Sequence, residues 1–373
     1  MFVHQHQLEH LLTPADYVSA DAHTREMERL FRPGWYPLAS RTQLPREGDF
    51  ITLELLGEPL LARRVGESIR AYLNVCPHRH ARLCGQARGH APTLRCQYHG
   101  WEYQADGRTA RIPDARCFRP FDREQARLVQ FRTASWGDLT FVSLADAGPS
   151  LADFLGTLAA EEAHWLAPPF ELAWTWSQDY PANWKVVVEN TLESYHIDCL
   201  HRKTLGRMPT EEECNHDLQE EYTRFVTPET IGWVSRMQNL LVGSLGGTIT
   251  NRYTHHHVHP HLWVITMDVM RMVQSIEPLT PTTSRHRVWV YTLRGQRRNP
   301  WAWLVKRLLR WIVVDTARRI LREDASIFPE IQAGLARSRF VGCIGTREER
   351  VYAFQRFVRQ RVGESAGSAG GQG

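Results

Sequence analysis

The alternation of apolar and polar positions divides the chain into segments of different character. Residues 14–31 carry a helical pattern that Thr13 can cap, with Pro14 at the first helical position. From about residue 35 to residue 145, short β-rich runs alternate with glycine, proline and aspartate turns, which predicts a small antiparallel β domain. Residues 145–165 are typical of a linker that runs into a helix.

The second half of the chain has longer elements. An amphipathic segment covers residues 184–205, and strands are expected near 252–276 and 285–294. Helices are expected over 300–337 and 346–361. The fold class is therefore α+β. The Gly/Ser-rich end, residues 363–373, is expected to be disordered.

The most apolar stretch, residues 301–314, is short and is interrupted by Lys306, Arg307 and Arg310. It should therefore not span a bilayer. Its charges recur at helical spacing beside tryptophan and leucine. This pattern favours a surface helix with one buried face over membrane association or partner docking.

Composition places the protein among ordinary globular chains. Its 373 residues, 42% of them hydrophobic, suffice for two domains or for one large domain with an insertion. A net charge of +4 predicts no general attraction to nucleic acid or to acidic membranes. The N-terminus lacks the pattern of a secretory signal, and seven cysteines are an odd number. Reduced thiols in a cytoplasmic protein are therefore expected, not a disulfide framework.

Two Cys–His pairs lie in loops of the predicted β domain. Cys76-x-His78 is followed by 17 residues and then by Cys96-x-x-His99. Four such ligands suit zinc, or a [2Fe–2S] cluster with two cysteines on one iron and two histidines on the other. Structural zinc sites more often use C-x2-C or H-x3–5-H spacing. The uneven pairs, with Pro77 and Trp101 in the loops, resemble the motif of the Rieske iron–sulfur proteins.

This resemblance has consequences for neighbouring positions. High-potential Rieske proteins carry two further cysteines that bridge the loops, whereas Gln97 stands where the second loop would hold one. No bridge is expected, and the lower-potential oxygenase type is implied. His80 stands where these oxygenases commonly have glycine. Cys84 and Cys117 are expected to be buried small hydrophobic residues and not ligands.

A second candidate centre lies in residues 183–205, where Glu189, Glu193, His196 and His201 crowd one segment. Glu193 and His196 are three residues apart and are predicted to share a helix face. His201 can reach the same point only if the helix ends or turns before it. Two histidines with a distant carboxylate form a triad that leaves open positions on Fe(II) for oxygen.

This segment resembles the mononuclear-iron motif of the Rieske non-haem iron oxygenases, and that resemblance assigns the roles. His196 and His201 are implied as iron ligands. Glu193 is implied as the carboxylate that bridges an iron-ligating histidine to a cluster-ligating histidine of a neighbouring subunit. Residues 319–335 resemble the family's late helix, where Asp324 takes the place of the third ligand and Glu323 is its rival.

The resemblance also implies an architecture and partners. An antiparallel β Rieske domain is expected over residues 35–145, and a helix-grip, START-like catalytic domain over 146–362. Residues 1–34 would pack on the catalytic domain. The protein would use O2 and electrons from NAD(P)H, delivered by a separate reductase with or without a ferredoxin. It would be a homotrimer, with no nucleic-acid or membrane partner.

The substrate is the least determined feature. Trp233, Tyr253 and Met267 are weak candidates for the substrate pocket, and Asn183 is a weak candidate for supporting the iron ligands. The histidine-rich run 255–261 is interpreted as pocket lining or packing in preference to an extra metal site.

Three activities remain open from the sequence. The glutamate at position 193 and the chain length favour hydroxylation or oxidative demethylation of a small organic substrate, as in the choline, glycine-betaine and carnitine oxygenase subgroup. The alternatives are cis-dihydroxylation of an arene and, in a different class, a Rieske electron carrier without oxygenase activity. A zinc-stabilised binding protein is a further possibility, and it would be colourless.

Overall fold

The structure is a computed structural model that describes residues 2–162, 169–229, 233–297 and 299–363. Of the predicted disordered end, residues 364–373 lie outside this described part. Contacts between residues divide the chain into two compact units. The β unit comprises Arg32–Ala160, and the mixed unit comprises Met1–Phe31 with Glu161–Gly373. The N-terminal segment thus belongs to the same unit as the C-terminal half.

The β unit contains a seven-stranded sheet of order β1-β10-β9-β4-β3-β2-β5 and a three-stranded sheet of order β6-β7-β8. The strands are β1 (Tyr36–Ser40), β2 (Asp49–Leu55), β3 (Glu58–Val65), β4 (Ser68–Leu73), β5 (Arg88–His90), β6 (Leu94–Arg95), β7 (Glu102–Tyr103), β8 (Thr109–Arg111), β9 (Gln130–Trp136) and β10 (Leu139–Ser143). All the pairings within both sheets are antiparallel. The small antiparallel β domain that the turn pattern predicts is confirmed.

The mixed unit is built on one antiparallel sheet of order β11-β17-β16-β15-β14-β13-β12. The strands are β11 (Phe170–Tyr180), β12 (Asn215–Leu218), β13 (Tyr222–Pro228), β14 (Arg252–Val258), β15 (Leu262–Thr266), β16 (Met270–Thr280) and β17 (Thr283–Leu293). The helices are α1 (Ala20–Glu26), α4 (Trp184–Leu192), α5 (Ile197–Leu200), α6 (Trp233–Ser244), α7 (Pro300–Leu335) and α8 (Glu349–Val362), while α2 (Leu151–Leu155) and α3 (Thr157–Glu162) lie near the unit boundary. Short 3-10 turns occur at η3 (Arg41–Gln43), η4 (Ala115–Phe118) and η5 (Thr346–Glu348).

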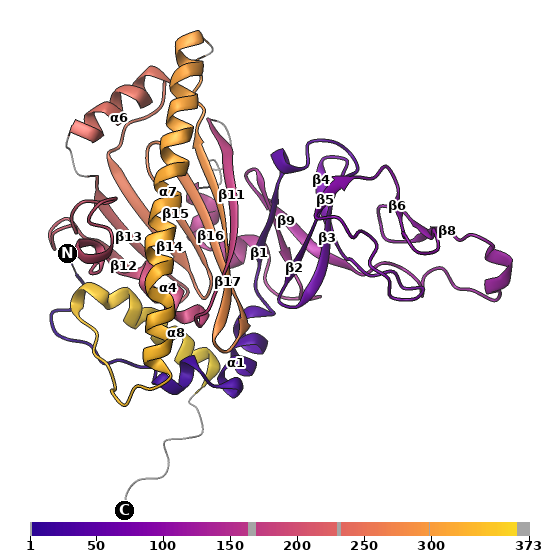
Figure 1. The fold of residues 1–373 in the computed structure, drawn as a ribbon, viewed down its shortest axis with the longest axis horizontal. Helices are drawn as coiled ribbons and strands as arrows, with labels where there is room; N and C mark the ends of the chain where they lie inside the picture. The colour runs from indigo at the N-terminus through magenta and orange to yellow at the C-terminus, as the bar shows by residue number, and fades with distance from the viewer. Residues whose placement is uncertain (1, 163–168, 230–232, 298, 364–373) are drawn as a thin grey trace, which may run out of the picture. The chain divides into compact units, whose positions relative to one another are not determined.

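Three helices cover one face of this sheet (Figure 1). The long helix α7 packs against β11 and β17, and α8 packs against β12 and β13. Between them, α4 contacts β16, α7 and α8. The buried positions of α7 include Ala302, Val305, Leu309 and Val313, which recur every three or four residues and so form one apolar stripe. Helices predicted over 300–337 and 346–361 are confirmed.

Two predicted helices are wrong in extent. Within residues 14–31, a 3-10 turn (Pro14–Tyr17) precedes α1, and a π-helical turn (Met27–Phe31) follows it. Thr13 caps the 3-10 turn, which has Pro14 at its first position, and the side chain of Ser19 accepts the hydrogen bond from Ala22 that begins α1. Within residues 184–205, α4 ends at Leu192 and α5 begins only at Ile197. The predicted continuous amphipathic segment is therefore broken at the candidate metal ligands.

Candidate metal centres

The two Cys–His loops of the β unit share one turn geometry. In the first, the backbone N–H of Cys76 donates to Ala81 and that of His80 donates to Cys76. In the second, the N–H of Cys96 donates to Trp101 and that of Gly100 donates to Cys96. His80 and Gly100, each four residues after a cysteine, both have a positive φ, of 59° and 70°. Glycine is the default residue in this left-handed conformation, and His80 adopts it in the first loop with the same backbone hydrogen bonds as the second loop.

The imidazoles of these loops meet face to edge. The rings of His78 and His99 have centroids 4.8 Å apart, and Trp101 stacks on His78 at 4.5 Å. The Nδ1 atom of His99 is buried and has no hydrogen-bond partner among the described residues. A buried ring nitrogen without a partner is costly unless another group occupies that position. The donor set therefore fits a metal cluster held by His78 and His99.

The two thiols complete the set. Cys76 and Cys96 are both buried, and the Sγ atom of Cys76 lies 3.0 Å from the hydroxyl of Tyr103. All seven cysteines are free, so the predicted absence of a bridge between the loops is confirmed. In place of a bridge, the side chain of Gln97 donates to the backbone oxygen of Arg82 in the other loop at 3.0 Å. Cys117 is exposed, so the expectation that it is buried is wrong.

In the mixed unit, the end of α4 presents the second candidate centre. Glu193 follows α4 with extended backbone angles, φ −124° and ψ 165°. His196 and His201 then flank α5 as its two capping residues. The prediction that Glu193 and His196 share a helix face is wrong, because the helix has already ended. The chain turns before His201, as the sequence required for both histidines to reach one point, and this turn places the second imidazole near the first.

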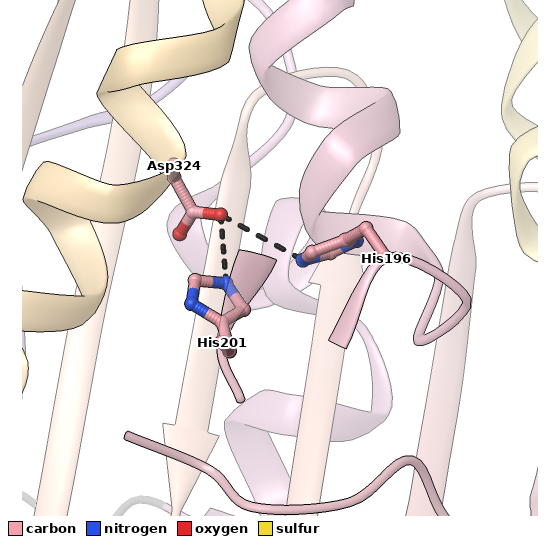
Figure 2. Close-up of side chains that lie close together, drawn as sticks. All are labelled: His196, His201 and Asp324. Carbon is pink, nitrogen blue, oxygen red and sulfur yellow. Dashed lines mark hydrogen bonds and ion pairs between the residues drawn. The ribbon is translucent and has the colours of Figure 1, made fainter. Parts of the chain in front are cut away.

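The candidate ligands His196, His201 and Asp324 converge (Figure 2). Asp324 Oδ1 lies 2.9 Å from Nε2 of His201 and 3.7 Å from Nε2 of His196. One ligand atom from each of the three residues lies within 4.8 Å of the others. Among the described residues, this is the one group of three such side chains found close enough to hold a metal ion.

Other side chains hold the outer edges of these ligands. Glu193 accepts a hydrogen bond from Nδ1 of His196, and Glu323 accepts one from Nδ1 of His201 at 2.7 Å. Asn190 donates to Asp324 at 2.8 Å. Glu323, considered as a rival of Asp324, thus lies on the opposite side of the same imidazole. Adjacent helical residues point about 100° apart, which is why the two acids take different sides.

The carboxylates beside His201 determine the direction in which its pKa shifts. Burial alone would lower the pKa of His201, but the carboxylates of Asp324 and Glu323 raise it above its ordinary value. Thr204 donates to Glu323 at 2.6 Å, and hydrogen bonds from His201 and Thr204 lower the pKa of Glu323 although burial opposes this. Two imidazoles and a carboxylate, each oriented by a further group, are the donor set that Fe(II) accepts in such triads.

Sequence reasoning missed several of these neighbours. Asn190 lies in the last turn of α4 and its partner Asp324 is 134 positions away, so no local spacing identifies it. Burial raises the pKa of Tyr180 in β11, and the charge of Asp324 raises it further. Asn183 instead caps α4, where it accepts from Lys185 and donates to Pro281. Among its described hydrogen bonds none reaches the triad, so its supporting role stays a prediction.

The weak pocket candidates have mixed outcomes. Burial raises the pKa of Tyr253, while the charge of Arg350 lowers it and that of Asp324 raises it. Tyr253 therefore lies within electrostatic range of the candidate iron site. Met267 lies half-buried at the turn between β15 and β16. The side chain of Trp233, at the start of α6, lies outside the described part of the structure.

The histidine-rich run packs in the interior. His255 receives a hydrogen bond from Arg350 at 2.8 Å, and its Nε2 lies 3.3 Å from the hydroxyl of Thr191. His257 and His259 lie against the ring of Phe354. Within the described residues no metal-binding group includes any member of the run. The geometry agrees with its interpretation as packing.

An uneven pair of Cys–His loops and a 2-His-1-carboxylate triad together define a protein with one iron–sulfur centre and one mononuclear iron centre. Comparison with known families gives the same result. Residues 34–130 match the Rieske [2Fe-2S] domain, and residues 171–364, more than half of the chain, match the ring hydroxylating alpha subunit (catalytic domain). The chain belongs to the family of ring-hydroxylating alpha subunits, the Rieske non-haem iron oxygenases. The two domains imply a Rieske cluster and a mononuclear iron as cofactors.

Curated relatives are about one-third identical to this chain within the region that matches. The glycine betaine monooxygenase oxygenase subunit of Chromohalobacter salexigens is 32% identical over 205 residues, which cover 55% of this chain and 46% of the relative. The carnitine monooxygenase oxygenase subunit of Escherichia coli K12 is 32% identical over 189 residues, or 50% of each chain. The matched region thus spans about half the length of these curated relatives.

A solved structure shows the same fold over almost the whole chain. The quaternary ammonium Rieske monooxygenase CntA in complex with L-carnitine has a TM-score of 0.76 and 21% sequence identity, covering 95% of both chains. At this identity the likeness shows the fold alone. The expected α+β fold, with a Rieske domain and a catalytic domain, is confirmed.

Proposed function

We propose that the protein is the terminal oxygenase component of a Rieske oxygenase system, which uses O2 and reductase-supplied electrons to hydroxylate or oxidatively demethylate a small organic substrate. The observation that carries this proposal is the convergence of His196, His201 and Asp324 in a chain that also holds the four Rieske-type ligands. A protein that only carries electrons would need the four Rieske-type ligands and no triad. When bound, the two iron groups supply the electron-transfer and oxygen-reducing chemistry.

The protein's own residues prepare the triad for a metal. Glu193 and Glu323 accept the Nδ1 protons of His196 and His201, which leaves Nε2 of each ring as the nitrogen available to a metal. Both Nε2 atoms then face Asp324. A neutral imidazole with a free Nε2 and an ionised carboxylate are the protonation states that metal binding requires.

Glu193 has a second proposed role, as the bridge between the two centres. Its carboxylate holds His196, and its proposed further partner is a cluster-ligating histidine of a neighbouring subunit. We therefore propose a homotrimer in which the Rieske domain of one subunit, residues 35–145, serves the catalytic domain, residues 146–362, of the next. The solved structure of a similar protein, a quaternary ammonium Rieske monooxygenase, gave insights into inter-subunit electron transfer. A separate reductase is the proposed electron donor.

The proposed substrate is a small N-methylated ammonium compound. The curated relatives act, by their names, on glycine betaine and carnitine. In this chain Tyr180 and Tyr253 both lie within range of Asp324, and aromatic rings attract quaternary ammonium groups by cation–π interaction. The second candidate is cis-dihydroxylation, since anthranilate 1,2-dioxygenase of Acinetobacter baylyi is also similar, with 30% identity over 203 residues.

The proposal is tested by a substrate screen with a surrogate reductase. The expected result is O2 uptake that depends on an ammonium substrate, with a product one oxygen atom heavier or one methyl group lighter. Exchange of His196 for alanine should abolish turnover and leave the red-brown colour of the cluster. Uptake that depends only on arenes would replace the proposal with dihydroxylation. Reductase-dependent electron transfer without any O2-dependent product would support the electron carrier.

A further inference from the structure

The N-terminal half of α7 carries a second apolar stripe besides the one that packs on the sheet. Trp301, Leu304, Leu308 and Trp311 recur at intervals of three and four residues, and their side chains are 46% to 64% exposed. At about 100° per residue, this stripe is centred roughly 120° round the helix from the buried stripe. It is about 15 Å long. The sequence predicts one buried face, and the structure shows that a second apolar face remains in solvent.

The neighbouring helix α6 adds to this surface. It packs against α7, and Figure 1 shows it beside the end of α7 that lies away from α8. Its Met237 and Leu240 are 50% and 62% exposed. Large side chains gathered in this way mark a surface that binds a partner, whereas scattered ones need no explanation.

The charges of the segment are all of one sign. No aspartate or glutamate occurs from residue 299 to residue 314, which contains Lys306, Arg307 and Arg310. Lys306 is paired with Glu171 at 2.8 Å. Arg310 donates to the backbone oxygen of Ala173, and Arg307 lies over the ring of Trp303. Neither arginine has a carboxylate partner among the described residues, so both positive charges remain available.

We propose that this face of α7, defined by Trp301, Leu304, Leu308 and Trp311, docks on the surface of an anionic lipid bilayer. Tryptophan and leucine on one side of a helix with arginine beside them is the composition of helices that lie in the membrane interface. Tryptophan favours that interface because its ring is apolar and its N–H is polar. No described helix is long and apolar enough to cross a membrane, so the contact is peripheral.

A two-fold contact between copies is a poorer occupant of this face. A two-fold contact between two α7 helices would bring Arg307 and Arg310 close to their own copies, and like charges at an interface are destabilising. An anionic surface instead neutralises both. The expectation of no membrane partner rested on the net charge of +4 and on the charges that keep residues 301–314 from spanning a bilayer, whereas a local cluster of positive charge suits a bilayer surface.

Co-sedimentation with lipid vesicles tests the proposal on the intact protein. The vesicles are phosphatidylcholine alone, or phosphatidylcholine with a quarter phosphatidylglycerol. Binding is expected to the anionic vesicles and to weaken with salt. Leu304→Glu with Leu308→Glu should abolish binding, and Arg307→Glu with Arg310→Glu should weaken it by roughly fivefold or more for each charge. Phe340→Glu and Arg337→Glu, at exposed positions outside the stripe, are the matched controls and should bind as the wild type does.

These measurements distinguish the possible partners of this face, and none of them requires catalytic turnover. The melting temperature and the absorbance of the cluster establish that each variant is folded. Wild-type protein that stays in solution with anionic vesicles overturns the proposal, and so do stripe variants that sediment like the wild type. If the leucine variants instead change the molecular mass measured by light scattering, the face is a contact between copies. If the leucine variants instead weaken binding of the electron donor, the face is a docking site for an acidic donor protein.

Discussion

Each histidine of the triad uses one ring nitrogen toward Asp324 and the other toward a further carboxylate. Glu193 holds His196 and Glu323 holds His201, so both imidazoles are fixed in orientation from behind. Such outer contacts raise the basicity of a ligand and prevent its ring from rotating. At the scale of single residues, therefore, Glu323 is expected to matter for metal affinity although it is not one of the three proposed ligands.

Replacement of Glu323 by glutamine should weaken Fe(II) binding about 10- to 100-fold, because the charge that supports His201 is lost. Anaerobic Fe(II) titration of protein depleted of the mononuclear iron measures this directly. Glu330→Gln, at an exposed position of the same helix, is the control and should bind iron as the wild type does. Equal affinities in the two variants would mean that Glu323 has only a structural role.

Tyr103 offers a corresponding test in the β unit. Its hydroxyl lies 3.0 Å from the sulfur of Cys76, where it can donate a hydrogen bond that stabilises the more negative, reduced cluster. Tyr103→Phe should therefore lower the reduction potential. If the hydrogen bond is stronger by roughly 1 kcal/mol in the reduced than in the oxidised cluster, its loss shifts the potential on the order of 40 mV for one electron. Protein-film voltammetry measures the shift, and Tyr98→Phe, which alters an exposed tyrosine of the second Cys–His loop, should show none. A potential unchanged or raised in Tyr103→Phe would contradict this role.

At the scale of elements, strongly periodic segments could be predicted and interrupted ones could not. The stripe of buried residues in α7 is visible in the sequence, and the helix was predicted close to its observed bounds. The end of α4 at Leu192 could not be predicted, because the helical pattern continues through Val186, Val187 and Val188 and the residues after them. The helix ends before Glu193, and the carboxylate of Glu193 points toward His196. This conformation depends on side-chain contacts, which helix propensity does not describe.

Buried histidines of the mixed unit predict a steep loss of stability in acid. Burial lowers the pKa of His256 to about 4 and that of His259, His261 and His286 to about 3. In the unfolded chain a histidine titrates near 6.5. Between these values the unfolded state binds more protons, so the free energy of unfolding is at its full value above pH 6.5 and decreases as the pH falls. Each such histidine contributes a slope of about 1.4 kcal/mol per pH unit.

Urea unfolding of the intact protein between pH 7 and pH 5 measures this slope. His259→Leu removes one of the buried groups and should make the dependence on pH shallower by about one proton. His6→Gln, which alters an exposed histidine, should leave it unchanged. A slope that is the same in both variants would show that His259 is already protonated or solvated in the folded protein.

At the scale of the whole molecule, each unit carries one candidate centre. The four Rieske-type ligands lie in the β unit, and the triad lies in the mixed unit. The cluster ligands could be predicted because they lie within two short loops. The triad and the contact of Glu193 with His196 were predicted from motif resemblance, but the contacts of Glu323, Asn190 and Thr204 were not. Asn190 and Thr204 bind acidic residues that are 134 and 119 positions away, and such pairings form only when α4, α5 and α7 come together.

The most direct test of two separate iron centres is the iron content of the wild type and of His201→Ala after anaerobic ferrous reconstitution. The wild type should hold about three iron ions per chain, two in the cluster and one in the triad. His201→Ala should hold about two, with the absorbance spectrum of the cluster unchanged. A wild type that stops at about two iron ions, or a His201→Ala variant that loses the cluster as well, would contradict the account.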